Sequence, residues 1–550
     1  MVDYCSRVVA FLTGSGDIHE RDTITAHATT PAISGSFTLT VNGQTTSTIA
    51  FNATAATVQS ALEALSNVAP GDVTCSMVTG ANLGVAGAKM LIVWGGAFDD
   101  TDPTVTADFT LLVVNPHVFA EVIRQRVTIP SGEGAAKTIK LARFRASGAT
   151  ALDTITNTAR ASWGATDGTN SGSCAVMAET GVFGSPFADT GYGIDNGSCL
   201  ALIGAASESN VGLAKFAAFG AGYVEIDWTV KANAAYRSSA RLWFGDDLEA
   251  KVFSVTGSGT VDTSADATPG FTNAPVLVEC ISVGQAMVPA GSGGELMLSV
   301  GAAARDGATI RQGCAVVCAE DNQSPSSVGV VTVSSRCAAR LTSAAGTVTQ
   351  GAALEVTVMA ANEIEFTTRD VAESLTVFGY AIAVPGVRGY AIAETAAVGT
   401  TGTKNLTAGF PITSWDIVSQ RAGTVGSVGS GQGNFSWGDT DGTTTALASF
   451  YSRDNQTTSE TRSLASTSLI VDVLDSTSPH DWSASPLAPI STGPRLSVSD
   501  AASANRVVVW WGLEKVTFQT PTAVGLALVL PAPARLLTLT PAAATLPLVL

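Results

Sequence analysis

The sequence of 550 residues has few charged side chains. They make up 14% of it, against about 25% in typical soluble domains, and the 46 acidic residues outnumber the 29 basic ones, for a formal net charge of −17. Binding to phosphate backbones requires positive charge, so we expect no nucleic-acid partner. A hydrophobic content of 45% and only 55 glycines exclude the highly charged disordered class and the collagen class.

Recognisable catalytic motifs are also missing. The four histidines, His19, His27, His117 and His480, are widely scattered, and the chain contains no Gly-x-Ser-x-Gly elbow, no Gly-Lys dipeptide and no Gly-x-Gly-x-x-Gly run. These absences argue against nucleotide and α/β-hydrolase chemistry. Glycan hydrolysis needs only two carboxylates, and nothing in the sequence points to such a pair. We therefore predict a non-enzymatic protein without a cofactor.

Long apolar runs are absent as well. Charged residues interrupt positions 1–25, so we expect no Sec-type export. The apolar, proline-rich segment 526–550 is cut into runs far shorter than the ~20 residues of a spanning helix, and we predict an arm that packs on protein, with no membrane span. The eight cysteines are too few for a disulfide scaffold, and the spacing of Cys314 and Cys318 favours core burial over zinc.

The clearest local signals lie near the N-terminus. Alternating apolar residues in 37–41, followed by Asn42-Gly43 and a second strand-like run at 46–51, predict a β-hairpin. A capping Asn52 or Thr54 and apolar residues at helical spacing then predict a helix that ends near Asn67. With later strands this gives a small α+β hairpin–helix module over residues 31–117, preceded by an N-terminal segment or anchor, residues 1–30.

This module resembles one that recurs in virion structural proteins of tailed bacteriophages, of the tail or fibre type. The resemblance is carried by Gly35-Ser-Phe-Thr-Leu-Thr-Val-Asn-Gly-Gln-Thr-Thr46 and by Asn52-Ala-Thr-Ala-Ala-Thr-Val-Gln-Ser-Ala-Leu-Glu-Ala-Leu65, and it covers about 85 residues. It implies a structural part of a phage particle and transfers no catalytic residue. Similar modules in bacterial surface proteins leave an adhesin as an alternative.

Beyond residue 118, Thr/Val/Ala/Ser-rich strands alternate with glycine-rich turns, and one landmark recurs three times. It is an apolar residue followed by glycine and then by an Asp-Gly pair, and successive copies lie 137 positions apart. A second landmark, an aromatic residue late in a hydrophobic strand, recurs after 134 and 133 positions at Phe244, Phe378 and Trp511. The first landmark comprises Trp163, Gly164, Asp167 and Gly168; Val300, Gly301, Asp306 and Gly307; and Trp437, Gly438, Asp441 and Gly442.

Repeats of this length are whole domains, so we predict three tandem β-sandwich-like repeats after the α+β module. Their expected bounds are 118–255, 256–388 and 389–525, followed by the arm 526–550. Tryptophan in the landmark could form a carbohydrate platform, but Val300 replaces it in the second repeat, which favours a core position. Whether the acidic loop containing Asp99, Asp100 and Asp102 binds calcium stays open, with a solvated turn favoured.

Together these observations predict a mainly β structural component of a bacteriophage virion, tail-associated or fibre-like, that acts in assembly and host attachment. Expected partners are copies of the chain itself, as a dimer or trimer, and other virion proteins. A capsid decoration or head fibre protein is the alternative within this class. A receptor- or glycan-binding adhesin is the alternative outside it, with host contacts from the segment 476–495 including Trp482; an exposed Trp482 would favour it and a buried one would weaken it.

Overall fold

The computed structural model describes most of the chain, and every described residue belongs to one compact unit, Val2–Lys515. Antiparallel strands dominate this unit, which confirms the predicted mainly β class. Among the described residues, no helix is long and apolar enough to cross a membrane. The described residues are 4–13, 18–98, 103–132, 134–156, 158–180, 188–203, 210–283, 292–293, 296–319, 328–344, 347–371, 373–396, 400–421, 424–430, 432–453, 461–474, 480–501 and 506–515.

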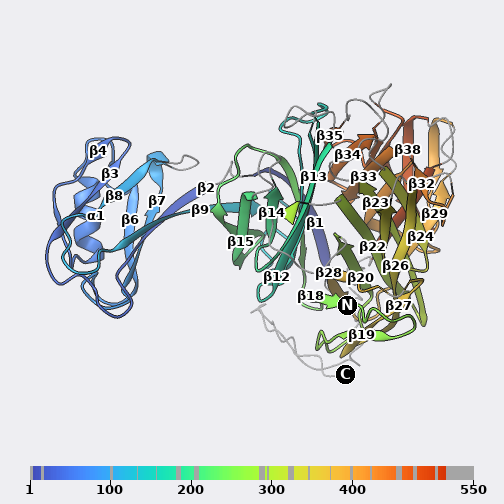
Figure 1. Ribbon diagram of the computed structural model, residues 1–550, viewed down its shortest axis with the longest axis horizontal. Coiled ribbons are helices and arrows are strands. Elements are labelled where there is room, and N and C mark those ends of the chain that lie inside the picture. Colours follow the sequence, from blue (N-terminus) through green and yellow to red (C-terminus); the bar gives the residue numbers. More distant parts are fainter. Residues whose placement is uncertain are drawn as a thin grey trace, which may run out of the picture. The chain divides into compact units, whose positions relative to one another are not determined.

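Three pairs of sheets make up most of the unit (Figure 1). Sheet pair 1 has one sheet in the order β1-β17-β10-β11-β12-β13, which we call its larger sheet, and a second in the order β9-β16-β15-β14, which we call its smaller sheet and which continues beyond β9 through β2, β7 and β6. One apolar core lies between the two sheets. The strands are β1 Cys5–Leu12, β9 Val118–Thr128, β10 Ile139–Ser147, β11 Thr158–Thr166, β12 Ser171–Thr180, β13 Ala188–Asn196, β14 Leu200–Ile203, β15 Asn210–Gly220, β16 Tyr223–Val230 and β17 Arg237–Phe244.

Sheet pair 2 follows after a short turn. Its larger sheet has the order β18-β28-β20-β22-β23-β24, its smaller sheet has the order β19-β27-β26-β25, and a second apolar core fills the space between them. The strands are β18 Glu249–Thr256, β19 Ser264–Ala267, β20 Leu277–Ser282, β22 Leu296–Asp306, β23 Thr309–Ala319, β24 Val328–Ser334, β25 Ala338–Ala344, β26 Thr347–Ala360, β27 Glu363–Arg369 and β28 Thr376–Ala383.

Sheet pair 3 completes the series with a larger sheet β29-β39-β31-β33-β34-β35, a smaller sheet β30-β38-β37-β36 and a third core. The strands are β29 Gly389–Ala396, β30 Gly402–Asn405, β31 Ile412–Gln420, β33 Gln432–Thr440, β34 Thr445–Arg453, β35 Thr461–Ser466, β36 Val471–Val473, β37 Trp482–Ile490, β38 Gly493–Asp500 and β39 Arg506–Glu514.

The strand order is the same in all three pairs. Numbered from 1 to 10 along the chain within each pair, the strands run 1-10-3-4-5-6 in the larger sheet and 2-9-8-7 in the smaller sheet. In sheet pair 1, residues 13–117 separate strand 1 from strand 2. Segment 1–30, expected to be a separate anchor, instead supplies strand 1 of this pair, because β1 pairs with β17 over its whole length. The expected boundary at 255/256 cuts β18, strand 1 of sheet pair 2.

The inserted residues form the helix-containing part of the structure (Figure 1). Asn42 and Gly43 both have positive φ, as a tight hairpin turn between β3 and β4 requires, and the Thr54 hydroxyl accepts the Thr57 N–H at the start of α1. The elements are β2 Ile18–Thr25, β3 Ser36–Val41, β4 Gln44–Thr45, β5 Ile49–Ala50, α1 Ala55–Glu63, β6 Val73–Thr79, β7 Lys89–Trp94, the 3-10 helix η1 Gly96–Phe98 and β8 Val105–Asp108.

Neighbouring sheet pairs are joined by short strand pairings that follow one rule. The segment between strands 3 and 4 of one pair adds to strand 6 of the preceding pair. β21 (Ser292–Gly293) joins β13, and β32 (Gly429–Ser430) joins β24. Thr156, between strands 3 and 4 of sheet pair 1, exchanges two 3.0 Å backbone hydrogen bonds with Ser463 on strand 6 of sheet pair 3. The contacts therefore run from pair 1 to 2, from 2 to 3, and from 3 back to 1.

Candidate functional site

The glycines of the first landmark, Gly164, Gly301 and Gly438, lie on strand 4 of the three larger sheets and face the smaller sheet of the same pair. A Cβ atom there would lie 1.9, 2.4 and 1.8 Å from a backbone carbonyl oxygen, that of Cys199, Cys337 and Ile470 respectively. Each of these carbonyls belongs to the residue just before strand 7. Glycine is therefore required at the landmark because the two sheets approach each other through backbone atoms.

The serines before these glycines bridge the same two sheets. The Ser162 hydroxyl donates to the Ala201 carbonyl, and the hydroxyls of Ser299 and Ser436 accept backbone N–H groups at 3.1 and 2.9 Å. The residue between serine and glycine faces away from the smaller sheet. Trp163 and Trp437 therefore do not fill the core of their own sheet pair, contrary to the expectation from the sequence. Both are buried, at 1% and 4% exposure, where the larger sheets of different pairs meet.

The Asp-Gly turns also reach across to a neighbouring sheet pair. Asp167 Oδ2 accepts the N–H of Val252 on β18, and Asp441 Oδ2 accepts the N–H of Val8 on β1, both at 2.8 Å. In each case the acceptor turn of one pair binds strand 1 of the next. In sheet pair 2, Asp306 instead ends strand β22, and Gly307 lies in the tighter turn that follows.

The second landmark does not mark one position in the fold. Arg241, Tyr380 and Trp511 occupy equivalent positions on strand 10 of the three larger sheets, because they pair with Arg143, Glu279 and Asp416 on strand 3. Phe244 lies three residues after this position and Phe378 lies two residues before it. Spacing alone matched these aromatics because each of the three strands carries several bulky side chains.

At the position of strand 3 that pairs with these residues, each larger sheet carries one buried charged residue: Arg143, Glu279 or Asp416. These three side chains meet at one point. Arg143 Nη1 lies 2.9 Å from Glu279 Oε2 and 2.7 Å from Asp416 Oδ1. Each residue comes from a different sheet pair, so this contact joins all three.

Three further residues complete what we call the ionic cluster. Asp439 Oδ2 lies 2.6 Å from Arg143 Nη2 and 2.7 Å from Arg145 Nη2, and Arg241 Nη1 lies 3.0 Å from Asp416 Oδ2. The cluster thus contains three arginines and three carboxylates and is formally neutral. Side-chain exposure is at most 4% for all six residues.

The free-energy cost of burying these charges is offset by their mutual attraction. Burial alone would lower the pKa of Arg143, but the carboxylates of Asp416 and Glu279 hold that pKa well above its ordinary value. Burial would likewise raise the pKa of Asp416, and the neighbouring arginines, Arg143 foremost, hold it below its ordinary value. The ion pairs therefore favour the charged forms of Arg143 and Asp416, whereas burial lowers the pKa of Arg145.

Glu279 is also fully occupied by uncharged donors. Trp163 Nε1 donates to Oε1 at 2.9 Å, and Tyr380 Oη and Trp511 Nε1 donate to Oε2 at 2.8 and 3.1 Å. With these partners and without solvent access, the carboxylate is not available as a general acid or base for a soluble substrate. The arrangement suits a fixed junction between sheets.

The ionic cluster was not among the predicted sites. One signal was present in the sequence: charged residues within largely apolar strands, in Ile-Lys-Leu-Ala-Arg143-Phe, Val-Leu-Val-Glu279-Cys and Ser-Trp-Asp416-Ile-Val. Charged residues are almost never fully buried unless they are paired, so each of these strands predicts a partner elsewhere.

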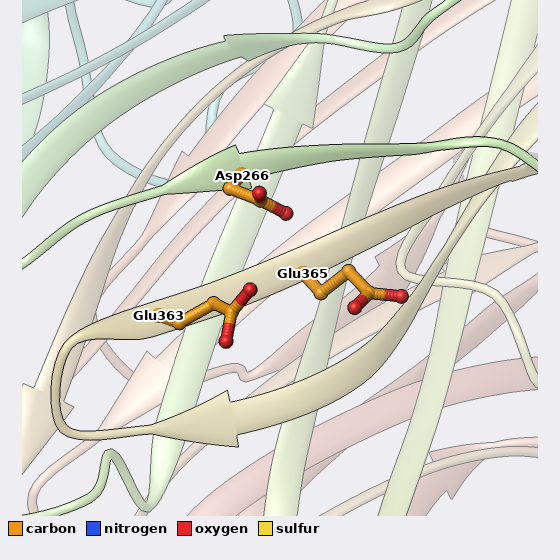
Figure 2. Close-up of side chains that lie close together, drawn as sticks. All are labelled: Asp266, Glu363 and Glu365. Atoms are coloured by element: carbon orange, nitrogen blue, oxygen red, sulfur yellow. The ribbon is translucent and has the colours of Figure 1, made fainter.

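One group of carboxylates among the described residues has metal-like spacing (Figure 2). Ligand atoms of Asp266 on β19 and of Glu363 and Glu365 on β27 lie within 4.8 Å of one another. Asp266 and Glu363 are exposed, and Glu365 already accepts hydrogen bonds from the Ser264 and Thr357 hydroxyls at 2.8 Å. Nothing else there indicates a cation. Asp99, Asp100 and Asp102 lie outside the described residues, as does the arm 526–550.

All eight cysteines are free thiols. Cys314 and Cys318 are buried in the core of sheet pair 2, which fits the core burial expected for them. Burial raises the pKa of Cys75 to about 12, so even this partly buried thiol is protonated at neutral pH.

A pH-dependent contact lies at the edge of sheet pair 3, where His480 Nδ1 is 2.8 Å from Asp472 Oδ2. The hydrogen bond to Asp472 raises the pKa of His480 above 6.5, with further contributions from Asp500 and Asp153. The folded protein thus binds this proton more tightly than the unfolded chain does. The stability from this pair is complete below pH 6.5 and is lost as the pH rises through the higher folded pKa.

We predict that His480→Asn lowers the free energy of unfolding at pH 6 and has a smaller effect at pH 9. Urea unfolding of both proteins over a pH series measures the difference. Burial raises the pKa of Asp472, which acts in the same direction at lower pH. A difference between the two proteins that stays constant with pH would refute this prediction.

Comparison with known proteins adds no relative: no family model, curated protein or solved structure gives a significant match to this chain.

Proposed function

We propose that the chain is a non-enzymatic structural component of a bacteriophage virion, tail-associated or fibre-like, that acts in particle assembly and host attachment. The hairpin, capped helix and strands of residues 31–117 support this through the resemblance of residues 35–65 to virion modules. The observation that carries the proposal is that three sheet pairs of one strand order are locked together by fully buried ion pairs. Such a body suits a permanent building block.

In this proposal the three sheet pairs are tandem copies of one β-sandwich domain. Ten strands follow one order in each pair, and the landmark glycine in each approaches the carbonyl oxygen of the residue just before strand 7. The module is then an insertion between strands 1 and 2 of the first copy. Domain insertions succeed most often at exposed loops between strands.

We further propose that one chain takes the place of a homotrimer. The copies contact one another in a cycle through β21, β32 and the Thr156–Ser463 pairing, and the ionic cluster takes one strand-3 residue from each. Closed cyclic assemblies of identical subunits use the same kind of heterologous contact repeated around an axis. The dimer or trimer expected from the sequence then corresponds to three domains of a single chain.

A disulfide across the closing contact tests this arrangement. Ser6 on β1 and Ser414 on β31 have hydroxyl oxygens 2.7 Å apart. In a Cys5→Ser background, the double variant Ser6→Cys/Ser414→Cys should oxidise to an intramolecular disulfide that keeps the monomer mass and shifts mobility on a non-reducing gel.

The single variants Ser6→Cys and Ser414→Cys serve as matched controls and should show no shift. Covalent dimers or trimers in the double variant would contradict closure within one chain, because sheet pair 3 would then contact sheet pair 1 of another molecule.

Burial of the tryptophans weakens the adhesin alternative. All nine are buried, and Trp482, the one singled out for host contact, is 0% exposed in the core of sheet pair 3. An indole that stacks on a sugar must present its face to solvent. The Trp-Gly-x-Thr-Asp-Gly landmark therefore does not support a carbohydrate platform.

Immunogold labelling of purified phage particles, with an antibody raised against the whole protein, tests the proposed function. Labelling of the tail supports the tail-associated form of the proposal, and labelling over the head supports the decoration alternative. Particles that carry none of the protein by immunoblot would refute a virion role.

A further inference from the structure

A cavity of about 240 Å³ lies where sheet pair 1 faces sheet pair 3, beside the ionic cluster. Sheet pair 1 contributes residues of β1, β10 and β17, among them Phe11, Arg145, Arg237 and Ser239. Sheet pair 3 contributes Trp437 and residues of β34 and β35. The cavity therefore lies across the contact that closes the cycle of sheet pairs.

The cavity exists because a small residue replaces a large one. Ser239 on strand 10 of sheet pair 1 is level with Phe378 on strand 10 of sheet pair 2, since they lie opposite Arg145 and Ile281 on strand 3. Between pairs 1 and 2, the Phe378 ring fills the space so closely that a Cβ on Gly172 would lie 1.9 Å from it. Between pairs 3 and 1, Ser239 leaves the corresponding space empty.

The polar groups around this space have unused hydrogen-bonding capacity. Ser239 is 7% exposed, and among the described residues its hydroxyl has no hydrogen-bond partner. The Arg237 guanidinium makes no hydrogen bond or ion pair within the same part of the chain, and its Nε is buried. Arg145 contacts Asp416 and Asp439 through Nη2 alone. Arg237 is half-buried, and a buried guanidinium nitrogen without a hydrogen-bond acceptor is unfavourable, so these groups indicate room for an anion.

The rest of the lining sets the shape of that anion. Phe11, Leu152, Trp437 and Leu447 supply apolar surface, and none of the lining residues is acidic. Carboxylates accept paired hydrogen bonds from arginine, and an apolar body gains by leaving water for such a surface.

We propose that this cavity, which we call the seam site, binds a small organic anion with an apolar body, of the aromatic carboxylate class. Arg237 and Arg145 hold the carboxylate, with Ser239 as a further donor, and the ring lies against Phe11 and Trp437. The bound anion bridges sheet pairs 1 and 3 and stabilises their contact by binding only the folded protein. This inference does not depend on a virion role.

Benzoate is the probe, and benzamide, which has the same ring without the charge, is its control. Calorimetric titration of the full chain should detect benzoate binding at millimolar concentration, with a rise in melting temperature, and weaker or no binding of benzamide. Arg237→Gln should weaken benzoate binding about tenfold or more, because a charge-assisted hydrogen bond is lost. This variant keeps the folded protein intact for the measurement.

Ser239→Phe copies the residue that fills the corresponding space in sheet pair 2. It should abolish benzoate binding without lowering the melting temperature of the ligand-free protein, and Ser239→Ala, the matched small variant, should retain most of the affinity. Absence of benzoate binding to the folded wild-type chain would overturn the proposal. Equal binding of benzoate and benzamide, or full affinity in folded Arg237→Gln, would overturn it as well.

Discussion

Methionine in place of Arg143 is expected to lower the free energy of unfolding by about 3–5 kcal/mol, as observed when one partner of a buried ion pair is removed. Arg143 contacts three carboxylates, those of Glu279, Asp416 and Asp439, at 2.6 to 2.9 Å. Methionine keeps the apolar stem of arginine and removes the guanidinium, so the loss reports the ion pairs and hydrogen bonds that this group makes. Urea unfolding of the purified full chain measures it.

Arg336→Met provides the control. Arg336 also contacts two carboxylates, Asp370 at 3.3 Å and Glu355 at 3.5 Å, but side-chain exposures of 20% to 33% leave these ions in contact with water. A partly exposed pair contributes about 0–1 kcal/mol, so this variant should unfold close to wild type. Equal effects of the two substitutions would mean that the ionic cluster is no more important than a surface pair.

In the proposed arrangement of three tandem domains, the charges of the ionic cluster give a reason for joining the domains in one chain. Arg143, Glu279 and Asp416 occupy one position of the shared strand order. In a homotrimer the same residue would occupy that position three times, and three like charges in contact would repel. Separate copies in one chain can differ, so opposite charges can meet at the centre and fix which copy contacts which.

Local features of the fold were predictable from the sequence, and long-range ones were not. Asn42-Gly43 and Thr54 favour a hairpin turn and a helix start within a few residues. The structure has β3, β4 and the start of α1 at these positions, but α1 ends at Glu63 and not near Asn67. Strand β1 gave no such signal of its partner, because residues 13–236 separate it from β17, the strand with which it pairs. Segment 1–30 was interpreted as an anchor because it precedes the α+β module in the sequence.

The ionic cluster shows the same limit for the candidate site. Each charged strand was visible in the sequence as an anomaly, but Arg143 and Asp416 are 273 positions apart and their partnership depends on how three domains meet. The direction of Trp163 was missed for a related reason. Alternation shows that Trp163 and Gly164 face opposite sides of a strand, but not which side faces the core of the same domain.

Alanine at Gly438 is expected to lower the free energy of unfolding by about 3 kcal/mol or more, because the added methyl group would lie against rigid backbone. Its Cβ would be 1.8 Å from the Ile470 carbonyl oxygen, so the two sheets of sheet pair 3 would have to separate. Gly164→Ala and Gly301→Ala should have effects of the same kind, since the corresponding distances are 1.9 and 2.4 Å. Urea unfolding compares the three variants.

Gly43→Ala is the matched control, because Gly43 has a positive φ of 82° and nothing lies within 4 Å of its Cβ position. That substitution costs only backbone strain, about 1 kcal/mol. If Gly438→Ala proved no more destabilising than Gly43→Ala, the close approach of strands 4 and 7 would not explain the landmark. A large loss at all three landmark glycines would show that the same backbone contact between strands 4 and 7 stabilises each of the three sheet pairs.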